Sequence, residues 1–398
     1  MASNILDNID MSKLGELLQQ ARKKCGVTQA DAAKIIDAAR TTIVAIEKGE
    51  RRLKPNELIK LARAYGKSIS DFVQSRPVIQ PFEVQFRSAY RRNEDEESLI
   101  NPSISHLEEL CRNYLDLEEI MDAPLPQNYP QEYEVSNMPI EAAAESIAIA
   151  ERQRLGLGDS PIAHLRNILE QNVGIRIFYI KMPAKYSEMY SFDDKLGGCM
   201  AINANHPEER RRWSLAHGYL HFLAHRRKAV VDFYGQYQRL PESERLAEAF
   251  PKYFLMPTSS LLKQFNDMHR SNGKFTPTNL FTLAHYYGVS VEALVYRLEE
   301  IGLLPSGTWE RLRERGLKVR KVQQELGLDT IVQRTDDTTP IHYQHLAIEA
   351  LDQGLITEGR FANFLDVDRL EARRIAEVLR EHSSGTLEDI SHLDLRQA

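Results

Sequence analysis

Two histidines four residues apart, His217 and His221, stand in the stretch Arg211-Arg-Trp-Ser-Leu-Ala-His-Gly-Tyr-Leu-His-Phe-Leu-Ala-His-Arg226. Residues i and i+4 share one face of a helix, so their imidazoles can converge on one zinc ion. In the H-E-x-x-H pattern, the glutamate after the first histidine takes a proton from metal-bound water. Glycine 218 stands there instead, and losing a general base typically removes on the order of 10²–10⁴ in rate. The stretch therefore predicts a metal-binding helix without its catalytic base.

A second predicted helix supplies carboxylates for the same metal. A bare pair of histidines is also typical of a buried helix with packed imidazoles. The downstream stretch Glu244-Arg-Leu-Ala-Glu-Ala-Phe-Pro-Lys-Tyr-Phe-Leu-Met-Pro257, however, places Glu244 and Glu248 on one helix face. A site built from two histidines and one carboxylate needs its third ligand from such a helix, and a further carboxylate can hold a ligating histidine by its other ring nitrogen. We therefore expect zinc ligands at His217, His221 and Glu244, supported by Glu248.

These motifs carry a family resemblance over residues 138–315. The pieces R-R-W-S-L-A-H-x-x-x-H-F-L, P-E-S-E-R-x-A-x-A-F and F-L-M-P resemble the ImmA/IrrE family of metallopeptidase-like domains. The resemblance implies a zincin-like α+β fold and a Zn²⁺ cofactor. It also implies that Gly218 replaces the catalytic glutamate and that Glu248 replaces the usual Asp or Asn. Peptidase activity is therefore not expected, although the metal ligands are retained.

The N-terminal part of the chain differs from the rest in charge. Residues 11–74 contain thirteen lysines and arginines against seven aspartates and glutamates, whereas the whole chain carries a net charge of −6. A basic module on an acidic body is typical of a protein that contacts nucleic acid at one end.

Within this basic stretch, residues 12–73 predict five short helices. Thr28 is the expected N-cap of a helix through Ile36, and a three-residue turn leads to a second helix over residues 40–48. Two helices joined by so short a turn are typical of a helix-turn-helix. The pieces T-Q-x-x-x-A, I-x-x-I-E-x-G and A-x-x-x-x-x-S-I-x-x-F resemble the Cro/C1 (XRE) family, although Asp37 stands at the usual turn glycine and Ala39 at the usual serine cap.

The helix-turn-helix interpretation assigns roles by position. The second helix is expected in the major groove, where arginine can pair with guanine and threonine can contact base edges. The first helix and the basic residues after the second helix are expected to contact phosphate. The candidate DNA-binding residues are Thr28, Gln29, Arg40, Thr41, Thr42, Ala45, Lys48, Arg51 and Arg52. Because such modules usually read paired half-sites, the expected partner is an operator in double-stranded DNA, bound by a homodimer.

The remaining segments complete a four-part prediction, mainly α with a small β-sheet. The parts are a helix-turn-helix domain over residues 11–75, a connector over 76–138, the metallopeptidase-like domain over 139–315 and a helical segment over 316–398. Strands are expected at residues 174–180 and 197–203, where β-branched and apolar residues cluster. The spacing of residues over 356–374 is also typical of a helix-turn-helix. Two interpretations of this segment remain: a second DNA-binding element, or a helical bundle that packs on the rest of the chain.

Composition excludes several classes of protein. Hydrophobic residues make up 42% and charged residues 27% of the 398 residues, as in ordinary globular proteins. No apolar run approaches the roughly 20 residues that span a bilayer, and the N-terminus lacks the pattern of a secretory signal. The three cysteines form no C-x-x-C pair, so neither a disulfide framework nor a cysteine metal site is expected. The expected location is cytoplasmic.

Three functions are compatible with this organisation. The first is a transcription regulator whose central domain senses a small molecule or binds a protein. The second is an active zinc peptidase that cleaves a repressor and uses another base, such as Glu248. The third is an antitoxin or phage-immunity regulator, which would share the DNA-binding module with the first.

Overall fold

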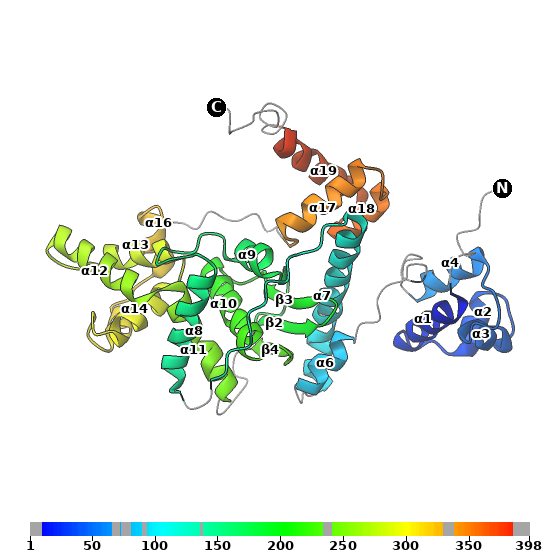
Figure 1. Cartoon of the computed structure of the whole chain (residues 1–398), viewed down its shortest axis with the longest axis horizontal. Coiled ribbons are helices and arrows are strands. Elements are labelled where there is room, and N and C mark those ends of the chain that lie inside the picture. Colours follow the sequence, from blue (N-terminus) through cyan, green and yellow to red (C-terminus); the bar gives the residue numbers. More distant parts are fainter. Residues whose placement is uncertain are drawn as a thin grey trace. The chain divides into compact units, whose positions relative to one another are not determined.

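The computed structural model describes residues 10–65, 72, 81–89, 94–135, 138–233, 241–328 and 338–384. It divides into two compact units, Met1–Val78 and Ile79–Ala398 (Figure 1). Across these described residues, no helix is both long enough and apolar enough to cross a membrane.

The first unit is a bundle of short helices. They are α1 (Met11–Lys24), α2 (Gln29–Ile35), α3 (Arg40–Glu47) and α4 (Pro55–Ala64). The Thr28 side chain accepts a hydrogen bond from the Asp31 backbone N–H at 3.2 Å, which caps α2 as the sequence predicts. Most of the predicted fifth helix lies outside the described residues, but Phe72 is buried with the core of this unit.

A single buried glutamate ties α1, α2 and α3 together. Glu47, at the end of α3, is 5% exposed and accepts hydrogen bonds from Arg22 at 2.5 Å and Gln29 at 2.9 Å. Burial opposes ionisation of Glu47, yet these donors lower the pKa of its carboxyl group. At Gly15 of α1, an added Cβ would lie 2.4 Å from the Ile46 carbonyl oxygen. A glycine is therefore needed where α1 crosses α3.

The second unit is built on a mixed four-stranded sheet. The strands are β1 (Arg176–Ile180), β2 (Tyr186–Asp193), β3 (Gly197–Asn203) and β4 (Val230–Phe233), in the order β1-β3-β2-β4. β1 pairs with β3 in parallel, while β2 is antiparallel to both β3 and β4. The predicted α+β class is confirmed. β1 and β3 were expected from the sequence, whereas β2 and β4 were not.

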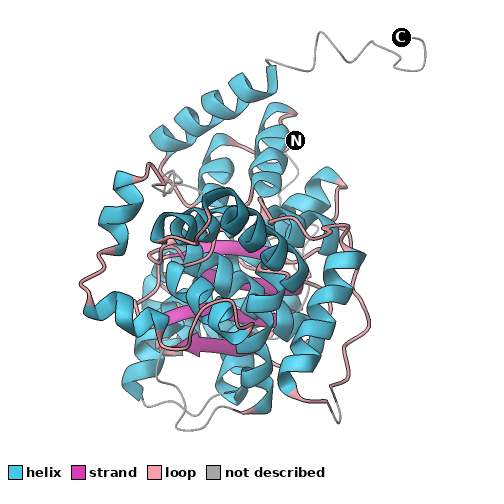
Figure 2. Cartoon of the chain, turned by 90° about the vertical axis from the view of Figure 1, so that its left-hand side faces the viewer, coloured by secondary structure: helices cyan, strands magenta, loops and turns pink. Residues whose placement is uncertain are grey.

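Both faces of the sheet are covered by helices (Figure 2). One face carries Ile177, Met200 and Ile202 into a core shared with α8 (Ile140–Arg154), α10 (Glu208–Ala224) and α11 (Glu242–Leu255). The other face carries Phe178 and Ala201 into a core shared with α6 (Phe82–Ala89) and α7 (Glu94–Met121). Figure 1 shows these two groups of helices on opposite sides of the strands.

Further helices enlarge the two cores. The first core includes residues from a short α9 (Leu165–Ile168), a π-helical turn (Leu169–Val173), α12 (Thr258–Asn272), α13 (Pro277–Tyr287), α14 (Val291–Glu300) and α15 (Thr308–Glu314), and α16 (Val319–Glu325) packs against it. The second core includes α17 (Ile341–Asp352), α18 (Glu358–Leu365) and α19 (Arg369–Ser384). The Thr338 carbonyl, just before α17, accepts hydrogen bonds from the Tyr179 backbone N–H and from Arg166, both at 3.0 Å. The C-terminal helices are thus bonded to strand β1.

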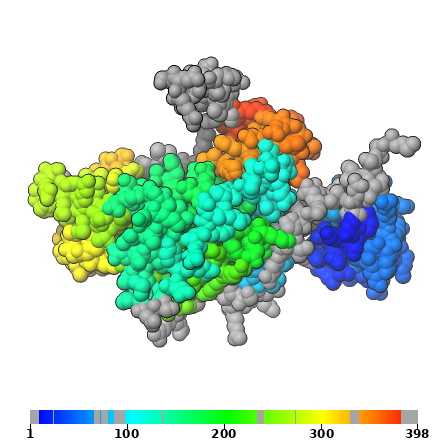
Figure 3. All heavy atoms as spheres, in the orientation of Figure 1, coloured from blue at the N-terminus to red at the C-terminus, as the bar shows by residue number. Residues whose placement is uncertain are grey.

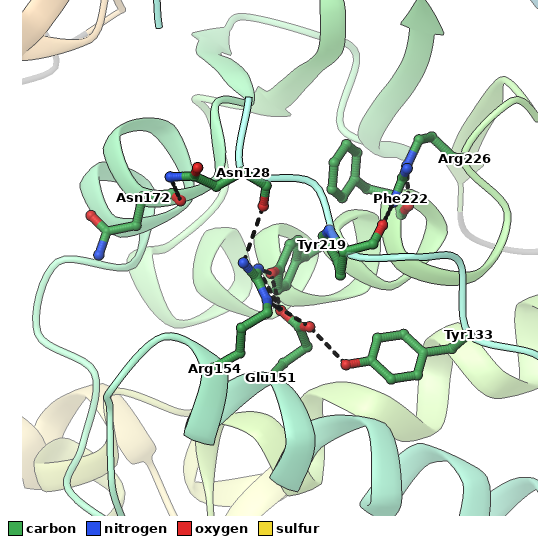
Figure 4. A network of polar contacts seen from close by, with 9 residues as sticks. Asn128, Tyr133, Glu151, Arg154, Asn172, Tyr219, Phe222 and Arg226 are labelled. Atoms are coloured by element: carbon green, nitrogen blue, oxygen red, sulfur yellow. Dashed lines mark hydrogen bonds and ion pairs between the residues drawn. The ribbon is translucent and has the colours of Figure 1, made fainter. Parts of the chain in front are cut away.

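An extended segment over residues 123–135 is fastened to α8 and α10 by a polar network (Figure 4). Glu151 of α8 is 0% exposed and accepts hydrogen bonds from Tyr133 at 2.9 Å, from Arg154 at 2.8 Å and from Tyr219 of α10. Arg154 also donates to the Asn128 carbonyl at 3.1 Å. The network fixes α8 against α10, the helix that carries both histidines.

Candidate functional site

Helix α10 brings His217 and His221 together in the interior of the second unit. The two side chains are 3% and 0% exposed, and their ring centroids lie 5.0 Å apart with nearly perpendicular planes. Two acidic residues, Glu208 and Glu209, occupy the first turn of the helix, where they complement the helix dipole. The predicted i, i+4 pair is therefore one buried cluster.

The third predicted ligand, Glu244, reaches the same cluster from α11. Its Oε2 atom lies 3.5 Å from His221 Nε2 and 3.8 Å from His217 Nε2. Ligand atoms placed about 2.0–2.2 Å from a tetrahedral zinc ion are about 3.3–3.6 Å from one another. The separation from His221 falls within this range and the one from His217 is slightly larger, so Glu244 Oε2 lies close to where a third ligand would be.

A fourth residue, Glu188 of strand β2, was not predicted from the sequence. It is 0% exposed, and its Oε1 atom lies 2.7 Å from His217 Nδ1. Glu188, His217 and His221 each offer a donor atom within 4.8 Å of the others. We favour Glu244 as the ligand because Glu188 faces the ring nitrogen that points away from Glu244, where it fixes the tautomer of His217.

The structure places Glu188, and not Glu248, in hydrogen-bond contact with His217. Glu248 is exposed, and no hydrogen bond joins it to either histidine within the described ranges. A sequence signal for Glu188 did exist. It lies among Tyr186, Tyr190 and Phe192, an aromatic alternation typical of a strand, and a buried carboxylate in a strand requires a partner.

The pKa values of the two histidines are shifted in opposite directions. Burial disfavours protonation of both rings, but Glu188 raises the pKa of His217 to about 10. Burial lowers the pKa of His221 to about 4, although Glu244 opposes this shift. Burial raises the pKa of Glu188 to about 7, whereas the neighbouring histidines lower that of Glu244 to about 2 despite its burial. His221 is therefore neutral at physiological pH, the form in which imidazole binds metals.

Unpartnered polar atoms show that the cluster fits a metal ion. His217 Nε2, both ring nitrogens of His221 and Glu244 Oε1 are buried without a hydrogen-bond partner among the described residues. Buried polar atoms are rarely left unpaired in proteins, and these belong to zinc-binding residue types. Zinc bound here would supply Lewis acidity and lower the pKa of a bound water.

Two other side chains lie close to the position of the missing catalytic glutamate. A Cβ atom added at Gly218 would lie 2.9 Å from Met200 Cε and 3.0 Å from Glu188 Oε1. A whole glutamate side chain at this position would need both neighbours to move. The structure therefore has a packed interior where H-E-x-x-H enzymes hold their base.

We predict that Glu188→Gln weakens zinc binding about 10–100-fold, because the amide cannot orient His217 as the carboxylate does. Competition with a chromogenic chelator measures this affinity. Glu248→Gln is the matched control and is expected to leave it unchanged. Equal affinities for the two variants would contradict the assigned role, and complete loss of zinc in Glu188→Gln would make Glu188 a ligand.

In the first unit, the candidate DNA-binding residues lie along α2 and α3 and the turn after them. Arg40, Thr41, Lys48 and Arg52 are exposed, whereas Thr42 and Ala45 are half-buried. Thr28 is exposed at the start of α2. A hollow of about 580 Å³ at this end of α2 is lined by residues that include Lys23, Thr28, Gln29 and Arg40. Most of the candidate DNA-binding residues thus have side chains at the surface of the first unit.

Two of the predicted contacts are already engaged within the domain. Gln29 donates to Glu47 and accepts from Arg40 at 3.5 Å. The Arg51 guanidinium makes two hydrogen bonds to Glu57, at 3.0 and 2.9 Å. The predicted phosphate contacts at Gln29 and Arg51 would therefore require these bonds to be shared or exchanged.

The fold is that of two classes of domain, a helix-turn-helix and a metallopeptidase-like α+β domain. Comparison with family models agrees with both. Residues 18–72 match a helix-turn-helix model, and residues 170–299 match the model of the IrrE N-terminal-like domain. The chain is a fusion of an XRE-type helix-turn-helix with an ImmA/IrrE-like domain.

No curated protein matches the chain. Among solved structures, the crystal structure of ComR from Streptococcus suis is 12% identical and is matched over 95% of this chain and 92% of that one, with a TM-score of 0.16. Because this score is so low, neither the fold nor the function assigned to this chain rests on that likeness.

Proposed function

We propose that this chain is a sequence-specific transcription regulator that binds operator DNA as a homodimer. Its metallopeptidase-like domain binds zinc and senses a signal or docks a partner, without cleaving peptide bonds. The observation that carries the proposal is the packing at Gly218. A side chain at Gly218 would meet Met200 and Glu188 at its first carbon, while the metal-binding groups beside them are retained. The helix-turn-helix gives the chain a DNA-binding function that needs no catalysis.

One observation bears on the alternative of a residual peptidase. Glu188 does place a carboxylate beside His217, near the lost glutamate position. That carboxylate is bonded to Nδ1, however, whereas a metal-bound water would lie on the side of Nε2. A general base must reach the proton it removes, either directly or through one water. Glu188 therefore supports the histidine in this proposal and does not act as a base.

We predict that Arg40→Ala lowers operator affinity about 10-fold or more, because one arginine–guanine pair contributes about 1–3 kcal/mol of discrimination. The operator is first obtained by selecting duplexes that bind the wild-type protein, and affinity is then measured by fluorescence anisotropy. Arg63→Ala, which removes an exposed arginine of α4, is the control and should bind nearly as the wild type does. Failure of the wild type to select any shared sequence would contradict the proposal.

We predict that Gly218→Glu does not create a peptidase. The new side chain must displace Met200 and Glu188, and overpacking of this kind costs about 1–3 kcal/mol of stability. A companion variant, Gly218→Glu with Met200→Ala, provides room and separates the steric effect from the chemical one. Zinc-loaded proteins are incubated with fluorescent casein and their unfolding is followed thermally. Metal-dependent cleavage by the wild-type chain would overturn the non-catalytic assignment.

A further inference from the structure

The C-terminal helices α17–α19 repeat the arrangement of α1–α3. When Thr357 is aligned with Thr28, α18 (Glu358–Leu365) falls on α2 (Gln29–Ile35), and α19 begins at Arg369 where α3 begins at Arg40. The preceding α17 likewise falls on α1. The helices α1–α3 belong to the first unit and α17–α19 to the second. The family model for a helix-turn-helix matches residues 18–72, in the first unit.

The repeat extends to the cap and to the turn. The Thr357 side chain accepts from the Arg360 backbone N–H at 3.2 Å, as Thr28 accepts from Asp31 at 3.2 Å. The turn residue after the first helix is Asp366 with φ +54°, matching Asp37 with φ +54°. Few residues other than glycine adopt this left-handed conformation, and aspartate is among those that do.

The backbone bonds of the two turns also correspond. In both units, the residue after the turn aspartate donates its backbone N–H to the carbonyl of the residue five positions earlier. These bonds are Ala38 to Ala33 at 2.9 Å and Val367 to Ala362 at 3.1 Å. The helices of both units are therefore joined by the same turn.

The buried positions of the two helix pairs coincide as well. The aligned pairs are Ala33 with Ala362, Ile36 with Leu365, and Ile43 with Ala372, and all six side chains are at most 8% exposed. In the preceding helices, Leu14 and Leu18 align with the buried Tyr343 and Ala347. The same positions thus face the interior in both units, which leaves the same face of the second helix outward.

The outward face of α19 presents arginines near its N-terminus. The Arg373 and Arg374 side chains are 64% and 68% exposed, and Arg369 aligns with Arg40. Their recorded partners are exposed carboxylates, Glu358 at 2.8 Å from Arg373 and Glu371 at 3.3 Å from Arg374. Such surface ion pairs contribute little, so DNA phosphates can replace them. Figure 3 shows α17–α19, in orange and red, at the surface of the second unit.

An apolar residue lies on the same face. Leu370, 62% exposed, stands at the position of Thr41. Apolar side chains at such positions can contact the methyl group of thymine, whereas arginine pairs with guanine or phosphate. Glu371, paired with Arg374, lies among these arginines in the first turn of α19. The arginines are thus at the end of the helix that meets the bases in a recognition helix, and Glu371 must exchange its partner on binding.

We propose that α17–α19 form a second helix-turn-helix that contacts double-stranded DNA through Arg369, Arg373 and Arg374. One chain then reaches DNA at two places, through α3 and through α19. This inference extends the proposed function and depends on it for the existence of an operator. The contact between α19 and DNA is also tested on a duplex of any sequence.

The test compares full-length Arg373→Ala/Arg374→Ala with the wild type on the selected operator and on a random-sequence duplex about four helical turns long. We expect about tenfold or more loss of affinity, and a slope of log affinity against log salt that is smaller by about two. The control is Arg313→Ala/Arg315→Ala, which removes two exposed arginines from the same unit and should bind as the wild type does.

The outcomes separate this inference from the proposed function. If the wild type selects no operator but the Arg373/Arg374 variant still loses salt-dependent binding to the random duplex, the proposed operator function fails and the second contact stands. If the wild type selects an operator and the variant matches its control, the second contact is overturned. A variant that keeps its DNA affinity but changes its sedimentation mass would show that α19 is a protein interface, which also overturns the inference.

Discussion

Replacing His217 with alanine is expected to remove stoichiometric zinc from the purified protein. The site offers two histidines and Glu244, whose Oε2 atom lies 3.5 and 3.8 Å from their Nε2 atoms. Binding of a structural zinc ion is worth about 10–16 kcal/mol. If the three ligands contribute equally to this free energy of binding, losing one of them weakens zinc binding roughly 10²–10⁴-fold. Elemental analysis by inductively coupled plasma mass spectrometry, after dialysis against a weak chelator, measures the remaining metal.

A neighbouring histidine provides the matched control. His225 lies one turn beyond His221, with ring centroids 5.7 Å apart, and is half-buried. His225→Ala should retain zinc. Because His217 also satisfies the buried Glu188, Glu244→Gln serves as a second test that leaves that pair intact. A wild-type chain without zinc, or one that keeps it after either ligand is replaced, would contradict the metal assignment.

The second large effect is expected at Glu151 of α8, which bonds to Tyr219 between the two histidines of α10. Glu151→Ala should lower the free energy of unfolding of the second unit by about 3–5 kcal/mol, the range for breaking a buried charged pair. The carboxylate is 0% exposed. Its removal takes one acceptor from Tyr133, Tyr219 and Arg154, and Arg154 keeps its bonds to Asn128 and Tyr219 (Figure 4). Equilibrium denaturation in urea, followed by circular dichroism, gives the difference.

A carboxylate on the same helix serves as the control for this prediction. The Glu141 side chain is 57% exposed and pairs with Lys252 at 2.5 Å. Exposed pairs of this kind contribute about 0–1 kcal/mol, so Glu141→Ala should have a small effect. If Glu151→Ala cost no more than Glu141→Ala, the network would not be what holds α8 against α10.

The metal site shows how far a sequence can be interpreted in physical terms. His217 and His221 could be predicted to meet because helix geometry alone brings them together. Glu244 followed from the need for a third ligand on a neighbouring helix. Glu188 was missed because strand β2 was missed. Its contact with His217 depends on how the sheet packs against α10, and no local spacing encodes that.

The fold was predictable to a similar degree. β3 was predicted over its observed residues. β4 (Val230–Phe233) is only four residues long, too short for its alternation to stand out. The long α7 (Glu94–Met121) lies in the stretch predicted as a connector and contains Pro102, a residue that normally marks a helix boundary. Tertiary packing of α7 against the second core overrides that local preference.

The measurement that most directly tests the central claim is genome-wide mapping of DNA occupancy by the full-length chain in its native cell. Discrete sites that share one sequence motif are expected. Arg40→Ala should markedly weaken occupancy at these sites, whereas Gly218→Ala, which leaves the DNA-binding unit untouched, should preserve it. Occupancy without a shared motif, or occupancy unaffected by Arg40→Ala, would contradict the conclusion that this protein is a sequence-specific regulator.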